Sequence, residues 1–323
     1  MTTVTDRTGT GTTATEAAAT EGAPHTPDAA PHTPDTPDAD DAQLARALGL
    51  RVCDLPALRA LTAGAAATAP DDPPLRLRDL LHRRLRSSVC DDMIDPRALL
   101  SARPRPAEPA LTGRPAVALP EPEQLPDITL AEAIERRSSS TTYAARPLPL
   151  ATLAGLLEGA AGIRGHRAGY NVRDFPVRRA PSAGGLAPVD VYVVANDVEG
   201  LGQGLYYYRP SGPELTLVDS GNMRGKVAEA GIAAEWLFHA PAVLFLALDM
   251  DRVAWKYGVR SYRYAHVDLG VLTQNLYLVA TGLGLEGSAV AAFDDDRADD
   301  LVRLDGRDAF VSLLFACGLP GGR

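Results

Sequence analysis

The stretch of chain from residue 242 to residue 284 limits the possible folds of this protein more than any other. Residues 242–249 form a near-continuous apolar run of strand length, which predicts a strand buried on both faces. Residues 266–283 predict a long apolar helix that is ended by Gly282 and Gly284. Helices and strands alternate around them without a regular strand–helix–strand rhythm. This pattern favours an α+β fold, with a central mixed or antiparallel sheet flanked by helices, over a Rossmann fold.

Capping residues and hydrophobic spacing predict the other elements of this domain. Thr129 and Glu132 form a capping box that begins a helix ending near Arg137. The other expected elements are helices over residues 150–161 and 224–238, a strand over 189–194, a hairpin over 204–209 and 214–219, and strands over 288–293 and 310–316. Together they assign residues 127–323 to one domain.

The first 126 residues differ in composition from the rest. Residues 1–40 are rich in Thr, Ala, Pro and Asp, which predicts a disordered tail because so few apolar side chains cannot offset the entropy of ordering. Residues 41–102 predict a small helical module. Its arginine-rich helix is either a solvated face or a docking surface for an acidic peptide or a partner protein. A proline-rich linker is expected over residues 103–126.

Charge and cysteine content exclude several classes of protein. The formal net charge of −9 argues against general nucleic-acid binding, which needs a basic surface. The three cysteines form no CxxC pair, so we expect neither a disulfide framework nor a metal site. We find no secretory signal and no apolar run of about 20 residues, and therefore expect a cytoplasmic protein that does not bind membranes.

Three segments far apart in the chain carry the side chains of a candidate ligand site. The first, Arg136-Arg137-Ser138, ends the capped helix and can clamp a phosphate through two guanidinium groups and a hydroxyl. Arginines at a helix C-terminus are also explained by the helix dipole, so this segment alone is weak evidence.

The second segment is a turn of small residues that lets backbone amides approach a planar ligand closely. It consists of Pro181, Ser182, Ala183, Gly184 and Gly185. The third segment, residues 256–264, packs three cationic side chains and three phenols into nine residues directly before the apolar helix. Lys256 and Tyr257 begin it.

The order and spacing of these segments resemble the nitroreductase-like flavoprotein superfamily, and within it the SagB-type azoline dehydrogenases. The resemblance covers residues 127–320 and leaves the N-terminal region outside. Besides the three segments, the matching features are Gly204-Leu205-Tyr206-Tyr207-Tyr208, Gln274-Asn275-Leu276 and Gly282-Leu283-Gly284.

The resemblance implies a homodimer that binds FMN in a groove between its subunits. It implies that Arg136, Arg137 and Ser138 hold the phosphate and ribityl end, and that the 181–185 loop lines the flavin from the partner subunit. It also implies that the 288–293 strand directs a backbone N–H at flavin N5. Relatives often carry two glycines where this chain has Ala291 and Ala292.

The implied reaction is the oxidation of thiazoline or oxazoline rings in a ribosomally made, modified peptide to thiazoles or oxazoles. A base removes the acidic α-proton, hydride passes to flavin N5, and oxygen reoxidises the flavin. Lys256 and Tyr257 are both candidates for the base, because burial lowers the pKa of a lysine and adjacent positive charge lowers that of a tyrosine. The implied partners are the azoline-bearing precursor peptide and cyclodehydratase components. Asp268 is expected to cap a helix, form an ion pair or contact the flavin.

Two other functions are compatible with the same residues. One is an NAD(P)H-dependent nitroreductase or flavin reductase acting on small molecules, since a fold does not fix its chemistry. The other is a non-catalytic scaffold that binds a peptide and whose flavin site has decayed. Two departures from the family pattern favour the scaffold: Ser140, where relatives carry a basic residue, and the Ala291-Ala292 pair.

Overall fold

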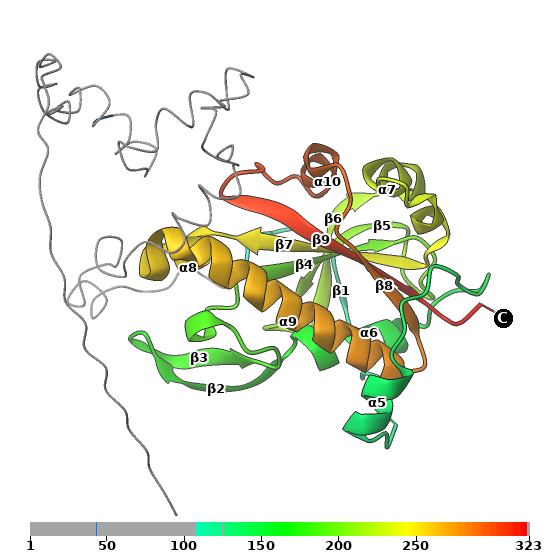
Figure 1. Ribbon diagram of the computed structural model, residues 1–323, viewed down its shortest axis with the longest axis horizontal. Helices are drawn as coiled ribbons and strands as arrows, with labels where there is room; N and C mark the ends of the chain where they lie inside the picture. The colour runs from blue at the N-terminus through cyan, green and yellow to red at the C-terminus, as the bar shows by residue number, and fades with distance from the viewer. Residues whose placement is uncertain (1–42, 44–107, 125, 322–323) are drawn as a thin grey trace, which may run out of the picture. The chain divides into compact units, whose positions relative to one another are not determined.

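The computed structural model describes residues 43, 108–124 and 126–321 (Figure 1). The tail expected over residues 1–40, and the arginine-rich helix expected before residue 102, lie outside the described residues. Within this part of the chain, no helix is long and apolar enough to cross a membrane.

The described strands form a seven-stranded sheet and a separate two-stranded ribbon, which with the helices gives the expected α+β fold. All pairings in the large sheet are antiparallel, and its order is β1-β6-β5-β4-β7-β9-β8. Its strands are β1 (Ala116–Ala118), β4 (Val189–Ala195), β5 (Gly204–Arg209), β6 (Glu214–Ser220), β7 (Ala242–Asp249), β8 (Glu286–Val290) and β9 (Ala309–Gly318).

Strand β7 is buried on both faces, as its apolar run predicts. It pairs with β4 on one side and β9 on the other. Because successive side chains of a strand point to opposite faces, Leu244 and Leu246 enter one hydrophobic core while Val243 and Phe245 enter a second core. The sheet therefore separates two cores, and each face needs its own cover of helices.

Different helices cover the two faces of the sheet (Figure 1). On the first face lie α6 (Leu150–Ala161) and the long α9 (Ser261–Gly282), which pack against each other and contribute Leu156 and Leu276 to its core. On the second face lie α7 (Arg224–Ala230), a 3-10 turn (Glu235–His239) and α10 (Asp295–Val302). The short helices α5 (Leu130–Arg136) and α8 (Asp251–Tyr257) flank the two ends of α9.

Two predicted helices have different bounds in the structure. The helix expected over 224–238 is wrong, because α7 ends at Ala230 and the 3-10 turn begins only at Glu235. Gly231 lies so close to Leu237 that a Cβ on it would be 2.7 Å from that side chain, and Ala233 has a φ of 51°, so the chain turns sharply here. Helix α9 begins at Ser261, five residues before the expected start, so the cationic and phenolic run is largely helical.

The two-stranded ribbon was not predicted. Its strands, β2 (Ile163–Gly169) and β3 (Val172–Arg178), pair antiparallel around Tyr170 and Asn171. These two residues have φ values of 49° and 58°, which is the left-handed pair that a tight hairpin turn requires.

The described part of the expected proline-rich linker belongs to the large domain. Residues 116–118 form β1, which pairs with β6 at the edge of the sheet. The Glu108 carboxylate accepts hydrogen bonds from Ser211, and Glu123 accepts one from Thr152. A strand of three residues is too short to show an alternating pattern, which explains why the sequence suggested only a linker.

Candidate functional site

The structure brings the small-residue loop together with the Lys256-Tyr257 pair. Gly184 has a φ of 62°, and a Cβ built on it would lie 2.6 Å from the phenol oxygens of Tyr170 and Tyr257 and 2.8 Å from Lys256 Nζ. Three polar groups therefore converge on the one residue whose missing side chain leaves room for them. Two of the three predicted segments thus form one cluster, although they are separated by about 70 residues of sequence.

Tyr170 completes this cluster and was not anticipated from the sequence. Its hydroxyl donates a hydrogen bond to the Gly184 carbonyl at 2.7 Å and accepts one from Lys256 Nζ at 2.5 Å. The Tyr170 ring packs edge-on against Phe175 and Trp255 at centroid distances of 5.2 Å and 5.7 Å. The only sequence signal for this position is the Gly-Tyr-Asn turn of the ribbon.

Lys256 is an ammonium held by phenols. Partial burial by itself lowers the pKa of Lys256, but hydrogen bonds to Tyr170 and Tyr257 favour the charged form, and the net effect raises the pKa above its ordinary value. Its Nζ also lies 4.7 Å and 5.0 Å from the ring centroids of these two tyrosines. The expectation that burial would bring this lysine toward the working pH as a base is therefore wrong.

Asp268 fixes the start of the same loop. The Ala183 N–H donates to both carboxylate oxygens of Asp268, at 2.9 Å and 3.1 Å. Burial raises the pKa of Asp268 to about 6, even though the Ala183 N–H opposes this shift. Asp268 lies in the second turn of α9, so it holds the loop and does not cap the helix.

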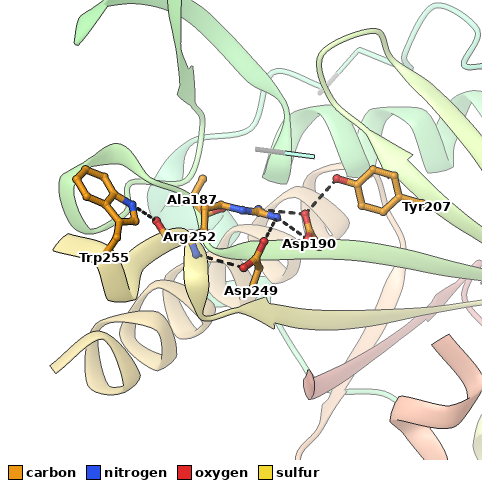
Figure 2. A network of polar contacts seen from close by, with 6 residues as sticks. All are labelled: Ala187, Asp190, Tyr207, Asp249, Arg252 and Trp255. Carbon is orange, nitrogen blue, oxygen red and sulfur yellow. Dashed lines mark hydrogen bonds and ion pairs between the residues drawn. The ribbon is translucent and has the colours of Figure 1, made fainter. Parts of the chain in front are cut away.

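Figure 2 shows a buried network of ion pairs and hydrogen bonds that contacts the backbone just after the loop, at Ala187. The Arg252 guanidinium, 2% exposed, donates to Asp190 at 2.7 Å and 3.1 Å, to Asp249 at 3.0 Å and to the Ala187 carbonyl at 2.9 Å. Tyr207 donates to the same Asp190 carboxylate at 3.1 Å. Because a buried arginine must keep its partners, these contacts tie the loop to β4, β7 and α8.

The first predicted segment, Arg136-Arg137-Ser138, lies apart from this cluster and borders an open cavity of about 430 Å³. Arg136 and Ser138 border it, together with Thr281, Gly284 and Gly287. A cationic group and a hydroxyl beside small residues, in a cavity of this size, suit the phosphate and chain of a flavin nucleotide. The residues present therefore fit FMN.

Arg137 and Tyr277 brace this cavity. The Arg137 guanidinium lies over the Tyr277 ring, 5.3 Å from its centroid, and Arg137 is not among the residues lining the cavity. The Tyr277 hydroxyl accepts a hydrogen bond from the Ala289 N–H at 2.8 Å and is 3.0 Å from the Ser139 hydroxyl. Tyr277, which carried no signal in the sequence, thus joins the loop after α5 to strand β8.

Ala291 and Ala292 lie beyond the end of β8, because the strand expected over 288–293 spans Glu286–Val290. Both alanines are exposed, and the Ala292 carbonyl accepts a hydrogen bond from Ile232 at 3.2 Å. Ser140, where relatives carry a basic residue, donates its backbone N–H to the Gly287 carbonyl at 3.1 Å.

Within one chain the two parts of the site lie at different levels of α9. Asp268 contacts the loop and Tyr277 lines the cavity. These two residues are nine positions apart on α9, which corresponds to about 13 Å along the helix axis. Among the described residues, no group of His, Cys, Asp and Glu side chains could hold a metal ion.

Comparison with known proteins agrees with this architecture. The chain is 33% identical over 184 residues to MJ1384 of Methanocaldococcus jannaschii, named provisionally as a nitroreductase, a match that covers 56% of this chain and 89% of that protein. It is 29% identical over 137 residues to the microcin B17-processing protein McbC of Escherichia coli, which covers 41% of this chain and 50% of McbC. The chain thus spans only half the length of McbC.

Solved structures show the same fold. A provisionally named nitroreductase from Ralstonia eutropha matches with a TM-score of 0.52 and 25% identity, over 69% of this chain and 96% of that one. Another from Anabaena variabilis matches with a TM-score of 0.58 and 22% identity, over 79% of this chain but only 49% of that one.

The antiparallel α+β architecture and a cavity suited to a flavin nucleotide define a flavoprotein-like oxidoreductase fold. The Nitroreductase family matches residues 133–319, more than half of the chain. The chain therefore belongs to the nitroreductase family, whose proteins commonly bind FMN.

Proposed function

We propose that this protein is an FMN-dependent dehydrogenase that oxidises thiazoline or oxazoline rings of a modified peptide to the aromatic azoles. The observation that carries the proposal is the convergence of Lys256, Tyr257 and Tyr170 on Gly184. Such a cluster provides proton-transfer chemistry beside the loop that would line the flavin. Similarity to a protein that processes microcin B17 supports the same class of substrate.

The two parts of the site would meet across a homodimer. Arg136 and Ser138 of one subunit would hold the FMN phosphate and ribityl chain, and the 181–185 loop of the other subunit would lie against its ring system. Their separation along α9 within one chain supports this arrangement. Bound FMN supplies the two-electron acceptor that the oxidation needs.

The residues of the cluster would divide the proton chemistry between them. The Lys256 ammonium, which donates to the phenol oxygens, favours negative charge on an oxygen beside it. In its phenolate form, Tyr257 Oη would therefore accept the α-proton of the azoline ring. Tyr170, bonded to both Lys256 Nζ and the Gly184 carbonyl, would keep the ammonium in place.

Mass spectrometry of a cyclised azoline peptide tests this function. We expect the loss of two hydrogens per ring, dependent on FMN and accompanied by peroxide. Tyr257→Phe should retain FMN and lose azole formation. The matched control is Tyr264→Phe, which removes the hydroxyl of the phenol that packs edge-on against Tyr257 at a 5.0 Å centroid distance and should remain active. Full azole formation by Tyr257→Phe would contradict the assignment of the base.

The assignment of the flavin cavity has its own test, which does not need turnover. Arg136 lines the cavity and Arg137 lies over Tyr277, so the two neighbouring arginines should differ. We expect Arg136→Ala to raise the Kd for FMN about tenfold to a hundredfold, the value of a charge-assisted hydrogen bond, and Arg137→Ala to raise it much less. Fluorescence titration of the apoprotein measures both. If both variants raise the Kd for FMN equally, Arg136 does not hold the phosphate in this cavity.

A second candidate function is an NAD(P)H-dependent nitroreductase acting on small molecules. It is favoured by the match to MJ1384, because this chain covers nearly all of that protein. Rapid reduction of the flavin by NADPH, followed by nitroaromatic turnover without azole formation, would identify it. Cyclodehydratase components and the precursor peptide remain partners only under the first proposal, and a cytoplasmic location remains a prediction.

A further inference from the structure

The β2–β3 ribbon is strongly basic in a chain that is acidic overall. Residues 163–179 contain five arginines and one aspartate, whereas the whole chain has a net charge of −9. Four of the arginines are exposed, namely Arg164, Arg167, Arg173 and Arg179. Within the part of the chain that the structure describes, none of the four takes part in an ion pair. The ribbon therefore presents four exposed arginines that form no ion pair with any described carboxylate.

The ribbon also offers a free strand edge. It contains only two strands, so each has one edge that no described strand pairs. Phe175 anchors the inner face of the ribbon in the core, while Arg164, His166 and Ala168 on β2 are exposed. Pro176 lacks an N–H and weakens the edge of β3, which leaves β2 as the better edge for a further strand.

One end of this ribbon forms part of the candidate site. Its turn carries Tyr170, which bonds to Lys256. The Arg167 guanidinium lies 3.4 Å from the position that a Cβ on Gly185 would occupy, beside the small-residue loop. A chain lying along β2 would therefore be led toward the Lys256 cluster.

We propose that the β2 edge docks an extended, acidic segment of the peptide substrate as an additional strand. The main-chain hydrogen bonds would supply affinity without sequence preference, and the exposed arginines would select for carboxylates. This inference rests on the proposed function in one respect, namely that the substrate is a peptide. Binding can nevertheless be measured without any flavin chemistry.

The test uses the full chain and a fluorescein-labelled decapeptide of alternating Glu and Val, with fluorescence anisotropy as the readout. We expect binding that weakens as salt is added, and no comparable binding of the matching Lys–Val peptide. Arg164→Glu combined with Arg173→Glu should weaken binding of the acidic peptide about tenfold or more. A peptide with alternate backbone nitrogens methylated should also bind more weakly, because it keeps the charge but loses the strand hydrogen bonds.

The matched control replaces two exposed arginines that lie outside the ribbon, as Arg146→Glu combined with Arg307→Glu. It changes the net charge by the same amount as the ribbon variant. This control should bind the acidic peptide as the wild type does. Equal weakening by both double variants would overturn the proposal, since only overall charge would then matter. So would unchanged binding by the ribbon variant.

The chain's own acidic segment is the competing occupant, because residues 28–41 contain five aspartates. Replacing these five by asparagine should leave the Kd for the peptide unchanged if the ribbon serves the substrate. A marked gain in affinity would assign the ribbon to that segment and overturn the proposal. Retained peptide binding in a protein that forms no azoles would instead count against the proposed function alone.

Discussion

Gly184→Ala should damage the site far more than the same change at the next residue. Both glycines have positive φ, 62° at Gly184 and 74° at Gly185, so alanine pays a similar backbone cost of about 1 kcal/mol at each. Their surroundings differ. A Cβ at position 184 meets three polar atoms at 2.6–2.8 Å, whereas at position 185 its nearest neighbours lie at 3.4 Å and 3.6 Å, which is ordinary contact.

The extra cost at Gly184 follows from the contacts that must break. The Tyr170 ring is packed between Phe175 and Trp255 and cannot easily swing away. Its hydroxyl must therefore lose the bonds to the Gly184 carbonyl and to Lys256, each worth about 1 kcal/mol at a half-exposed position. We expect Gly184→Ala to lower the free energy of unfolding by about 3 kcal/mol and Gly185→Ala by about 1 kcal/mol.

Urea unfolding measures both free energies, and azole formation measures the effect on the site. Gly184→Ala should lose nearly all turnover, while Gly185→Ala should keep most of it. If the two variants match in stability and in turnover, the three polar groups do not converge on Gly184 as described.

Three further predictions concern the surrounding groups. Tyr170→Phe keeps the ring packing but removes a hydrogen bond that raises the pKa of Lys256. The alkaline limb of the pH–rate profile should therefore move to lower pH. The free energy of unfolding should change by about 1 kcal/mol or less. Burial raises the folded-state pKa of Asp268 from 3.8 to about 6, so its contribution to stability is present at low pH and lost as the pH rises through that window. Relative to Asp268→Asn, the wild type should lose about 1–2 kcal/mol between pH 4 and 7, allowing for solvent screening; parallel pH–stability curves in urea would contradict this. Arg252→Met leaves two carboxylates without their buried partner and should cost about 3–5 kcal/mol in urea unfolding, and a loss below about 1 kcal/mol would refute that role.

The predictable parts of the fold are those whose own residues mark them. The capping box at Thr129 fixed the start of α5, and the apolar run of β7 revealed a strand buried on both faces. The ribbon was missed because only one of its faces touches the core, so β2 contains few apolar residues. The end of α7 was missed because it depends on the close approach of Gly231 to Leu237, which only the tertiary structure creates.

The candidate site was predictable to a similar degree. The sequence supplied the loop, the arginines and the Lys256-Tyr257 pair, and the structure brings the loop and the pair into contact. Tyr170 could not be found in this way, because it is 86 residues from Lys256 and meets it through a hairpin turn. The direction of the Lys256 pKa shift could not be predicted from the sequence either. Burial lowers this pKa and hydrogen bonding raises it, so the net direction depends on partners that only the structure identifies.

The Arg252 network has a consequence for how this protein can diversify. Its contacts hold the carbonyl of Ala187, so the backbone that follows the loop is positioned by residues outside the Lys256 cluster. If the ribbon binds the substrate peptide as proposed, its exposed residues could therefore change the choice of peptide without disturbing the Lys256 cluster. The reverse also holds: a change at Asp190 would remove a carboxylate partner of Arg252 and so disturb the backbone after the loop, although Asp190 lies outside the Lys256 cluster.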